Sequence, residues 1–393
     1  WLKILGGRHP SHPFTSLFLF EAALLSRTME TRLTKLLGME VPIMLAGMAP
    51  TSGPELAAAV SNAGGFGTMG CASLSPLGLR RTIQQCQALL KPGRPMGVDF
   101  LLPKVGDGAK KTNKSYTGDQ LEELVKVMEE ELRANDLFVC AVGLPPKFVV
   151  DRLHAKGIRV MNMIGSPKHV KGCIAAGVDI ICAQGGEGGG HTGAVFSMVL
   201  FPQVVDLCRG TGILVVGAGG IVDGRGIAAA LTLGVDGVWM GSRFIVTPEA
   251  NAPPELKEHL VKATSDDTVH TRLYTGRTLR ALASPYHSEW EGPRVVEMRE
   301  MLEQGKVPFD KDARKGRFGK DQYAVGWWIG GYTPDTWLDR RKPIPDGVDL
   351  LSMGITVGQS VGALKSIEPA EEVLRSLTAQ LQEALKAMPS SRL

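Results

Sequence analysis

Eight short apolar runs, separated by stretches with helical periodicity, lie between residues 41 and 244. Continuously apolar strands that alternate with helices indicate a parallel sheet buried on both faces. Eight such βα units are what a (β/α)8 TIM barrel requires, and we therefore predict an α/β fold of this type. An open, doubly wound sheet is the alternative, but it does not usually need eight regular units. The expected strands are 41–47, 66–71, 95–102, 137–143, 159–165, 179–184, 212–220 and 236–244.

The stretches between these runs have the features of amphipathic helices. Many of them end on a glycine directly before the next apolar run, which is the usual C-terminal cap of a helix. The expected helices are 53–64, 76–90, 118–135, 145–157, 167–177 and 224–234.

The pattern changes after residue 244. Residues 249–344 are rich in charge, proline and tryptophan, and they predict a small helical and loop-like subdomain on the substrate side, inserted after the eighth strand. Residues 345–393 predict a C-terminal segment with a helix that returns to the barrel, and the barrel itself is expected within 29–248.

The two ends of the chain carry possible targeting signals. Residues 1–28 contain the apolar run 14–25, which is too short to span a bilayer and is interrupted by Glu21. We interpret 1–28 as a leader or extension without a folded role. The last three residues, 391–393, read SRL, a variant of the peroxisomal signal SKL. This predicts a peroxisomal protein, with a cytoplasmic location as the alternative and no membrane association.

Composition argues against two classes of function. The net charge of +4 is too small to indicate nucleic-acid binding. The six cysteines form no CxxC pair and no cluster with histidine at metal-ligand spacing, so we expect free thiols in a reducing compartment and no metal site.

The seventh apolar run ends in Gly219-Gly220, and the eighth contains Gly241-Ser242 near its end. In a TIM barrel the active site lies at the C-terminal ends of the strands, and the loops after strands seven and eight frequently bind phosphate. Bare backbone N–H groups can converge on an anion there. We therefore favour a phosphate site over the alternative of simple tight turns.

The sixth run leads into the stretch QGGEGGGHTG, residues 184–193, which holds six glycines. Gln184 is expected at the strand tip, and Glu187 follows it. Glycine permits a positive φ and close contact between backbone and ligand. His191 is the side chain of this loop that can take up a proton near neutral pH, so it is expected to be functional rather than structural.

Four motifs of the sequence together resemble the nitronate monooxygenase family, once called 2-nitropropane dioxygenases. They are AGM at 46–48, the histidine loop, AGGI at 218–221 and MGSRF at 240–244. The family consists of FMN-dependent barrels and includes flavin-dependent enoyl-ACP reductases. The similarity runs in order from 41 to 244 and resumes at TGRTLR, 275–280, and VGQSVGAL, 357–364.

The resemblance implies an FMN cofactor and assigns roles by position. His191 would be the catalytic base. The flavin ring would be met by Ala46, Gly47 and Met48 and held by Gln184, with Asp99 near it, and the phosphate would be held by Gly219, Gly220, Gly241 and Ser242.

Two positions depart from the family pattern. Many relatives have asparagine where Asp99 stands, and a carboxylate there would oppose a reduced, anionic flavin. Many also have alanine at Gly188, a difference expected to be harmless. The insert at 104–118 and the tryptophan-rich subdomain lie outside the bacterial pattern, so we expect substrate specificity to reside there.

The function implied by the resemblance is oxidation of alkyl nitronates, and of nitroalkanes if His191 deprotonates them, by O2 to carbonyl compounds and nitrite. The partners would be a small nitronate and O2, and the chain could act as a monomer or a homodimer. The alternative is an NADH-dependent flavin reductase of quinones or enoyl thioesters on the same scaffold. A barrel that serves only as a scaffold is a third reading, which the intact histidine loop and glycine corner disfavour.

Overall fold

The computed structural model describes residues 29–315, 317–318, 341–344 and 349–387. The proposed leader at 1–28, the SRL terminus and the tryptophan-rich stretch within 319–340 lie outside these ranges.

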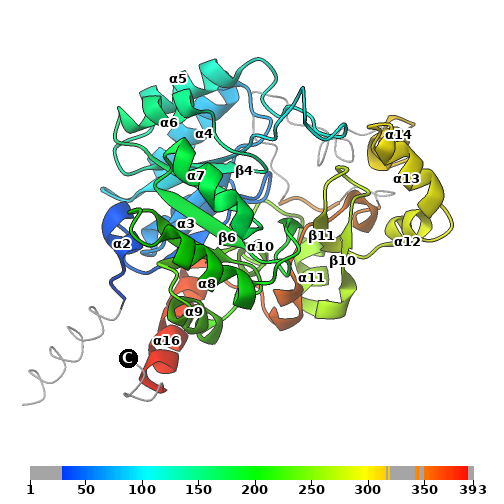
Figure 1. Cartoon of the computed structure of the whole chain (residues 1–393). Coiled ribbons are helices and arrows are strands. Elements are labelled where there is room, and N and C mark those ends of the chain that lie inside the picture. The colour runs from blue at the N-terminus through cyan, green and yellow to red at the C-terminus, as the bar shows by residue number, and fades with distance from the viewer. Residues whose placement is uncertain (1–28, 316, 319–340, 345–348, 388–393) are drawn as a thin grey trace, which may run out of the picture.

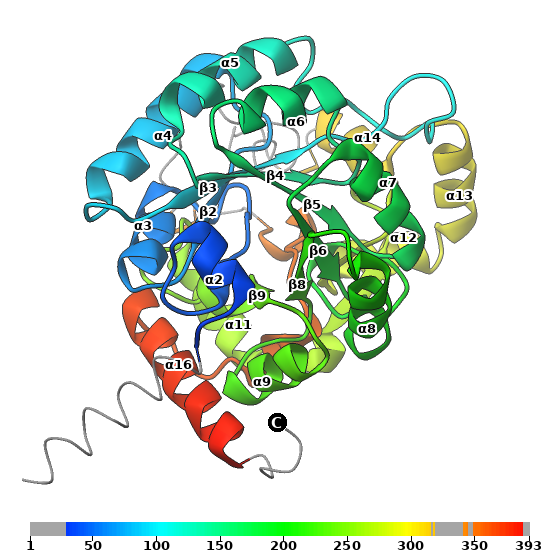
Figure 2. The ribbon, with the colours of Figure 1, turned by 60° about the vertical axis from the view of Figure 1, so that its left-hand side comes forward.

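A barrel of eight parallel strands forms the centre of the molecule, with helices around it (Figure 1, Figure 2). The hydrogen-bonded order is β1-β9-β8-β6-β5-β4-β3-β2. A parallel bridge between Met44 and Phe66 joins the two ends of this order and closes the barrel. The predicted fold is thus confirmed. The strands are β1 (Ile43–Leu45), β2 (Gly67–Gly70), β3 (Met96–Leu101), β4 (Leu137–Ala141), β5 (Arg159–Ile164), β6 (Ile180–Gln184), β8 (Leu214–Ala218) and β9 (Gly237–Met240).

Seven helices follow strands of the barrel in sequence and cover its outside. One of them, α8, was not predicted. It contains Pro202, and it exposes Met198, Val199 and Leu207, so it shows no amphipathic period that a sequence pattern could detect. The helices are α3 (Pro54–Asn62), α4 (Pro76–Leu89), α5 (Leu121–Glu131), α6 (Lys147–His154), α7 (Val170–Ala176), α8 (Ser197–Cys208) and α9 (Gly224–Thr232).

Helix α2 (Arg32–Leu37) lies across the end of the barrel where the strands begin (Figure 2). The Thr31 hydroxyl caps its start, and Gly38, with φ of 68°, ends it in the left-handed conformation. Leu33 and Leu37 point into the apolar interior of the barrel, where they join Met44 and other strand residues. The N-terminal end of the barrel is therefore filled and closed.

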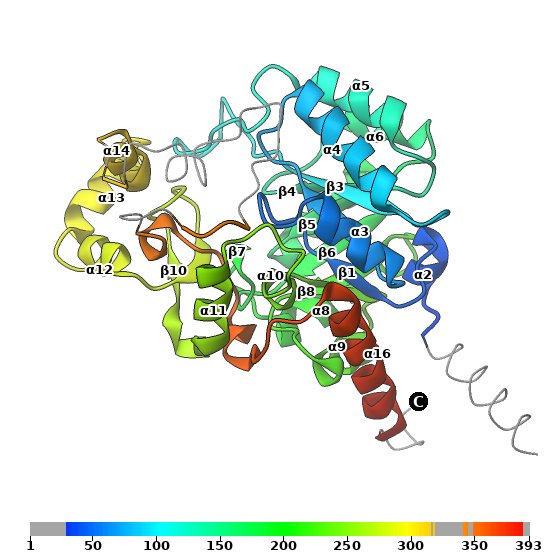
Figure 3. The same cartoon turned by 180° about the vertical axis from the view of Figure 1, so that it is seen from behind.

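Helix α16 (Ala370–Ala387) packs beside α9 and α3, although it is the last helix described (Figure 3). Val373, Leu374, Leu377 and Leu381 bury one face of it in the outer core. The approach is close, since a Cβ on Gly224 would lie 2.2 Å from the backbone nitrogen of Leu381. This helix takes the position around the barrel that the helix after the eighth strand would occupy.

The chain between β9 and α16 is not only helical. A β-hairpin, β10 (Thr268–Thr271) and β11 (Leu279–Leu282), lies among its helices. Both strands are four residues long, too short for a pattern of alternation to stand out. The helices are α10 (Ser242–Ile245), α11 (Pro254–Lys262), α12 (Pro285–Glu291), α13 (Val295–Glu303) and α14 (Pro308–Arg314), with 3-10 turns η3 (Leu351–Met353) and η4 (Gln359–Ala363). Ser242, expected at the end of a strand, begins α10 instead.

The insert at 104–118 extends from the barrel toward α14 (Figure 1). Lys114 forms an ion pair with Asp310 of that helix, and Thr112 donates a hydrogen bond to the carbonyl of Gly276 at 3.5 Å. The insert thus connects the barrel to the loop of the hairpin.

None of the helices that the structure describes is both long and apolar enough to cross a lipid bilayer.

Candidate active site

A cavity of about 900 Å³ opens at the C-terminal ends of the strands. Residues that follow the barrel strands line it, together with the hairpin loop at 277–278 and the returning chain at 355–360. The sequence-predicted site residues all lie in this lining: Ala46, Gly47, Met48, Asp99, Gln184, His191, Gly219, Gly220, Gly241 and Ser242. Their roles in binding and catalysis remain predictions.

The histidine loop contains a short strand, which its composition did not suggest. Gly190–His191 form β7, which pairs antiparallel with β11 of the hairpin. His270 contacts the carbonyl of Gly186 at 2.9 Å, and Arg280 donates to the same oxygen at 3.2 Å. The loop is therefore fixed from outside the barrel, by the segment that follows the eighth strand.

The glycines of this loop are needed mainly because the loop packs against other backbone of the protein. A Cβ on Gly193 would lie 1.9 Å from the carbonyl oxygen of Gly165, and one on Gly189 would lie 2.6 Å from Val357. Gly190 has a φ of +74°, which favours glycine for conformational reasons. A Cβ on Gly188 would lie 2.9 Å from the side-chain nitrogen of Gln184, which could move, so alanine there would cost little.

Glu187, the other ionisable residue of the loop, has a structural contact. Both of its carboxylate oxygens accept from the backbone N–H of Ser197, the first residue of α8, at 3.1 and 3.2 Å. An anion at a helix N-terminus is stabilising. The contact leaves His191 as the side chain of the loop that is suited to proton transfer.

His191 is half-buried, and its Nε2 lies 3.0 Å from the hydroxyl of Thr275. Burial, followed by the positive charge of Arg277, lowers the pKa of His191 to about 4. The imidazole is therefore neutral at physiological pH and has a lone pair available for a proton. The Thr275 hydroxyl also contacts the backbone of Arg277, at 3.3 Å from both its N–H and its carbonyl oxygen, so it holds the ring to the hairpin loop.

The glycine corner lies in the wall of the cavity, and phosphate binding there remains a prediction. Gly219 and Gly220 are consecutive residues with φ of +102° and +70°. Across from them, a Cβ on Gly241 would lie 3.2 Å from the sulfur of Met48. The hydroxyl oxygen of Ser242 accepts from the N–H of Gly358 at 3.0 Å, which fixes the returning chain to this corner.

Asp99 is buried at the tip of β3, only 6% exposed. Its Oδ1 has no hydrogen-bond partner among the residues the structure describes, and desolvation raises the pKa of Asp99 well above its usual range. We had expected a charged carboxylate here; burial without a partner instead favours the neutral acid. Asn162 is also a cavity residue, and its buried Oδ1 likewise has no hydrogen-bond partner among the residues the structure describes.

Sequence reasoning missed several residues of the site. Thr275 and Arg277 belong to the TGRTLR stretch, and Gly358 and Ser360 to VGQSVGAL. Both stretches stood out by resemblance, but nothing in their sequence indicated that they reach the histidine loop. Asn162 could have been found as a polar residue within an apolar strand.

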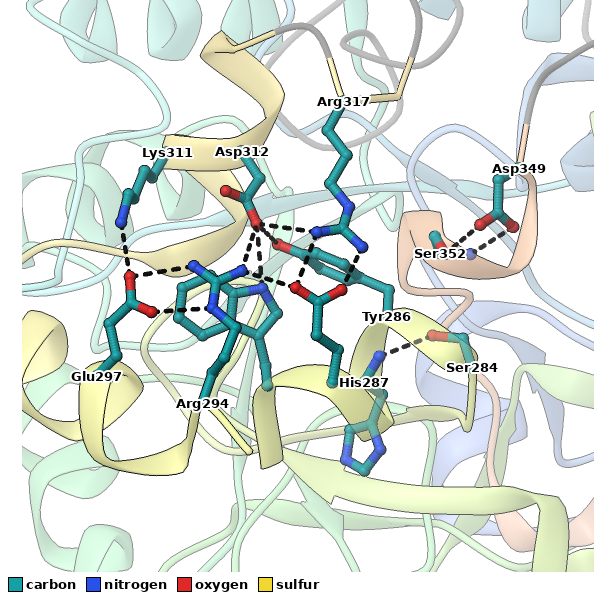
Figure 4. Close-up of polar contacts among 12 residues, drawn as sticks. Ser284, Tyr286, His287, Arg294, Glu297, Lys311, Asp312, Arg317, Asp349 and Ser352 are labelled. Atoms are coloured by element: carbon teal, nitrogen blue, oxygen red, sulfur yellow. Dashed lines mark hydrogen bonds and ion pairs between the residues drawn. The ribbon is translucent and has the colours of Figure 1, made fainter. Parts of the chain in front are cut away.

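A second polar cluster lies between α12, α13 and α14 (Figure 4). The buried carboxylate of Asp312 accepts from the Tyr286 hydroxyl and the Trp290 indole, each at 3.1 Å, and faces Arg294 and Arg317 at 3.7 and 3.8 Å. These polar groups satisfy one another, and none of these residues lines the cavity. We interpret the cluster as a structural one.

Three comparisons identify proteins similar to this chain. The family profile described as "Nitronate monooxygenase" matches residues 30–380. A Staphylococcus aureus protein named as a nitronate monooxygenase is 32% identical over 306 residues, which cover 67% of this chain and 82% of that protein. The solved structure of a nitroalkane oxidase from Streptomyces ansochromogenes has a TM-score of 0.70 and 25% identity, covering 91% of this chain and 99% of the other.

A third relative carries a different activity in its name. It is a Mycobacterium tuberculosis protein named (3aS,4S,5R,7aS)-5-hydroxy-7a-methyl-1-oxo-octahydro-1H-indene-4-carboxyl-CoA dehydrogenase. It is 36% identical over 255 residues, which cover 65% of this chain and 66% of that protein.

Proposed function

The chain belongs to the nitronate monooxygenase family, and from this premise we propose that it oxidises alkyl nitronates with O2 to carbonyl compounds and nitrite, using FMN. The family consists of oxidoreductases that act on small molecules. The choice of substrate and of FMN is our own inference from the cavity.

The cavity fits a flavin in three respects. Its volume of about 900 Å³ lies within the range of small-molecule and cofactor sites. Glycine backbone forms the corner after β8 and β9, where Gly219, Gly220, Gly241 and Ser242 would hold the phosphate. The buried Oδ1 of Asp99 lacks a partner in the described protein, as expected where a ligand supplies one.

The remaining cofactor-binding residues would hold the ring. Ala46, Gly47 and Met48 would lie against it, and Gln184 and a neutral Asp99 would face its edge. When bound, the flavin supplies the electron-transfer chemistry, and the protein supplies orientation and proton transfer.

The observation that carries the proposal is the neutral, anchored imidazole of His191 in the wall of this cavity. A neutral nitroalkane must lose the proton on the carbon next to its nitro group before it can be oxidised. His191 is unprotonated at neutral pH, as the acceptor of that proton must be, although its lowered pKa makes it a weaker base than a free imidazole. A substrate that arrives as the nitronate needs only to be held in place.

The relative named as a CoA-ester dehydrogenase supports a second candidate function. On this reading a flavin in the same cavity would exchange hydride with a thioester, or would carry hydride from NADH to a quinone. O2 would not be the co-substrate. His191 would then act on a carbon acid next to a thioester carbonyl.

Two anaerobic mixtures separate the candidates. We expect the purified protein to be yellow and its absorbance to bleach with propionate 3-nitronate under argon, with nitrite and carbonyl product released in air. Bleaching by NADH under argon, with no response to the nitronate, would instead support the reductase.

The identity of the flavin is tested by denaturing the protein and separating what is released. We expect FMN, because the cavity has one glycine corner for one phosphate group; FAD would contradict this. Gly241→Val should reduce flavin content sharply, because the side chain would enter the corner next to Met48. Gly241 has a φ of −106°, so this change adds no backbone strain. A substitution at Gly220 would be a less specific test, because a Cβ there would lie 2.8 Å from the side chain of Glu187.

A further inference from the structure

The lining of the cavity carries an excess of positive charge. Its permanently charged side chains, within the described part of the chain, are Lys110, Lys168 and Arg277. Its one carboxyl group is Asp99, whose pKa burial raises well above its usual range. Lys110 and Lys168 are exposed at the rim, whereas Arg277 is half-buried.

The contacts of Arg277 are all to neutral oxygens. Its Nη1 donates to the side-chain oxygen of Asn113 at 3.0 Å, and its Nη2 donates to the carbonyl of Val142 at 3.0 Å. No carboxylate lies within ion-pair distance of it in the ranges that the structure covers. Guanidinium groups carry five donors, so three of these remain for a ligand.

Other half-buried arginines of the protein do have carboxylate partners. Arg243 pairs with Glu368 at 2.6 Å, and Arg294 pairs with Glu289 and Glu297 at 2.8 Å each. Arg277 therefore differs from Arg243 and Arg294 in lacking a carboxylate partner, a condition that it shares with the buried Arg280, which donates to the carbonyl of Gly186 and the hydroxyl of Thr268 but does not line the cavity. A desolvated charge is costly unless an opposite charge compensates it, and an anion in the cavity would provide that compensation.

The position of Arg277 indicates which anion this is. Its contact with Val142 places it near the end of β4, which β5 and β6 separate from β8 and the glycine corner. The phosphate of the cofactor is thus expected elsewhere. The backbone of Arg277 contacts Thr275, which holds His191, and its charge acts on the imidazole. Arg277 and the base thus line the same cavity, and both are joined to the hydroxyl of Thr275.

We propose that Arg277 binds the two oxygens of the substrate's nitronate group beside His191. This assignment rests on the proposed function. The planar guanidinium suits a two-oxygen anion, as it suits a carboxylate. With a neutral nitroalkane, the C–H bond breaks, its proton goes to His191, and its electron pair forms the C=N bond. The negative charge that develops on the nitro oxygens then faces Arg277.

Nitrate, an unreactive anion with a planar oxygen pair, is the probe for this site. Its affinity for the holoenzyme is measured by calorimetry in the wild type, Arg277→Gln, Arg277→Lys and the control Arg159→Gln at the opposite end of the barrel. Losing a hydrogen-bonded charge should weaken binding about 10- to 100-fold in Arg277→Gln. Arg277→Lys should lose less because it keeps the charge, and Arg159→Gln should bind as the wild type does.

A second variant keeps Arg277 in place. Asn113→Asp puts a carboxylate next to Nη1, and this internal anion should compete with nitrate and weaken its binding. Nitrate binding that is unchanged in both Arg277→Gln and Asn113→Asp would overturn the assignment.

Two substrates show which part of the ligand faces Arg277. Ethyl nitronate carries its charge on the reacting group alone, whereas propionate 3-nitronate adds a carboxylate. We expect Arg277→Gln to raise KM by similar factors for both. A rise confined to propionate 3-nitronate would place the carboxylate there and overturn the assignment.

The pH profile provides a readout that a purely structural role would not move. Removing the positive charge should raise the apparent pKa of the base in kcat/KM from its lowered value, and Arg277→Lys should keep it low. If nitronates are not oxidised at all, the proposed function fails, but nitrate binding still tests the anion site by itself.

Discussion

The polar side chains at the two ends of the barrel differ in whether the protein itself provides their hydrogen-bond and ion-pair partners. At the N-terminal end, Asp136, Asp179 and Asp236 each stand directly before a strand. They accept from an N–H group in the first two residues of the neighbouring strand, those of Met96, Val160 and Val215, at 2.8 to 2.9 Å. At the C-terminal end, the Oδ1 atoms of Asp99 and Asn162 lack a hydrogen-bond partner within the described protein, and Arg277 donates to neutral oxygens without a carboxylate partner.

Within one sheet, the polar contacts at the N-terminal end therefore contribute to stability, whereas the polar groups at the C-terminal end are available for function. Buried polar groups normally find hydrogen-bond partners within the protein or in ordered water. At the N-terminal end the chain provides these partners, and Arg32 adds an ion pair to Asp236 at 2.8 Å. At the other end a ligand is expected to provide them. Comparable substitutions at the two ends should therefore have different consequences.

The largest effect is expected for His191→Asn, at the C-terminal end. Turnover of a neutral nitroalkane should fall about 10²- to 10⁴-fold, the usual contribution of a general base. An ionised nitronate should lose only about tenfold, for one lost hydrogen bond. The two substrates are compared by steady-state kinetics at equal flavin occupancy.

The matched control is His154→Asn, at the N-terminal end, where His154 contacts Asp179 at 2.7 Å. It should lower stability slightly and leave both rates unchanged per folded molecule. Small and equal losses on both substrates in His191→Asn would mean that His191 is only structural.

A moderate effect on stability is expected for Asp136→Asn. Its two oxygens accept from the backbone N–H groups of Met96 and Arg133 at 2.9 and 2.8 Å. An amide can replace only one of these acceptors, so the free energy of unfolding should fall by about 1–3 kcal/mol. Urea unfolding measures the change, and unaltered stability would show that this end does not depend on the contact.

Asp99→Asn, at the same depth but at the opposite end, should cost little or stabilise the protein. The raised pKa means that the folded state of the wild type binds its proton more tightly than the unfolded chain does. Wild-type stability is therefore lost as pH rises above about 3.9, the ordinary pKa of aspartate. The variant lacks this loss, so its advantage should grow from pH 5 to pH 8 in thermal unfolding of the apoprotein. An advantage that shrinks over this range would mean that Asp99 is ionised when folded.

The sequence predicts the barrel well because each buried strand is a continuous apolar run. It also predicts the site residues that follow these strands, since the C-terminal ends of parallel strands meet at one edge. Thr275 and Arg277 could not be found in this way. Thr275 reaches His191, and Arg277 reaches the same cavity, because β11 pairs with β7, a contact between residues more than 80 positions apart.

The glycines of the histidine loop show a second limit. Their number predicts close contact between backbone and a ligand, whereas the contacts that the structure shows are with other backbone of the protein. Gly189 and Gly193 face the backbone of Val357 and Gly165, which belong to distant segments. Likewise, the sequence shows that Asp99 is an acid, but the rise of its pKa follows from burial, which only the folded chain reveals.

Hydrogen–deuterium exchange of the apoprotein, with and without FMN, tests the contrast between the two ends most directly. At short labelling times, when exchange reports local opening, we expect FMN to slow exchange in 184–193, 219–221, 240–242 and 355–360. Exchange at the starts of β3, β5 and β8 should not change. Protection at those strand starts, or no local protection around the glycine corner and the histidine loop, would contradict the conclusion that the C-terminal end of the barrel is the end built for a ligand.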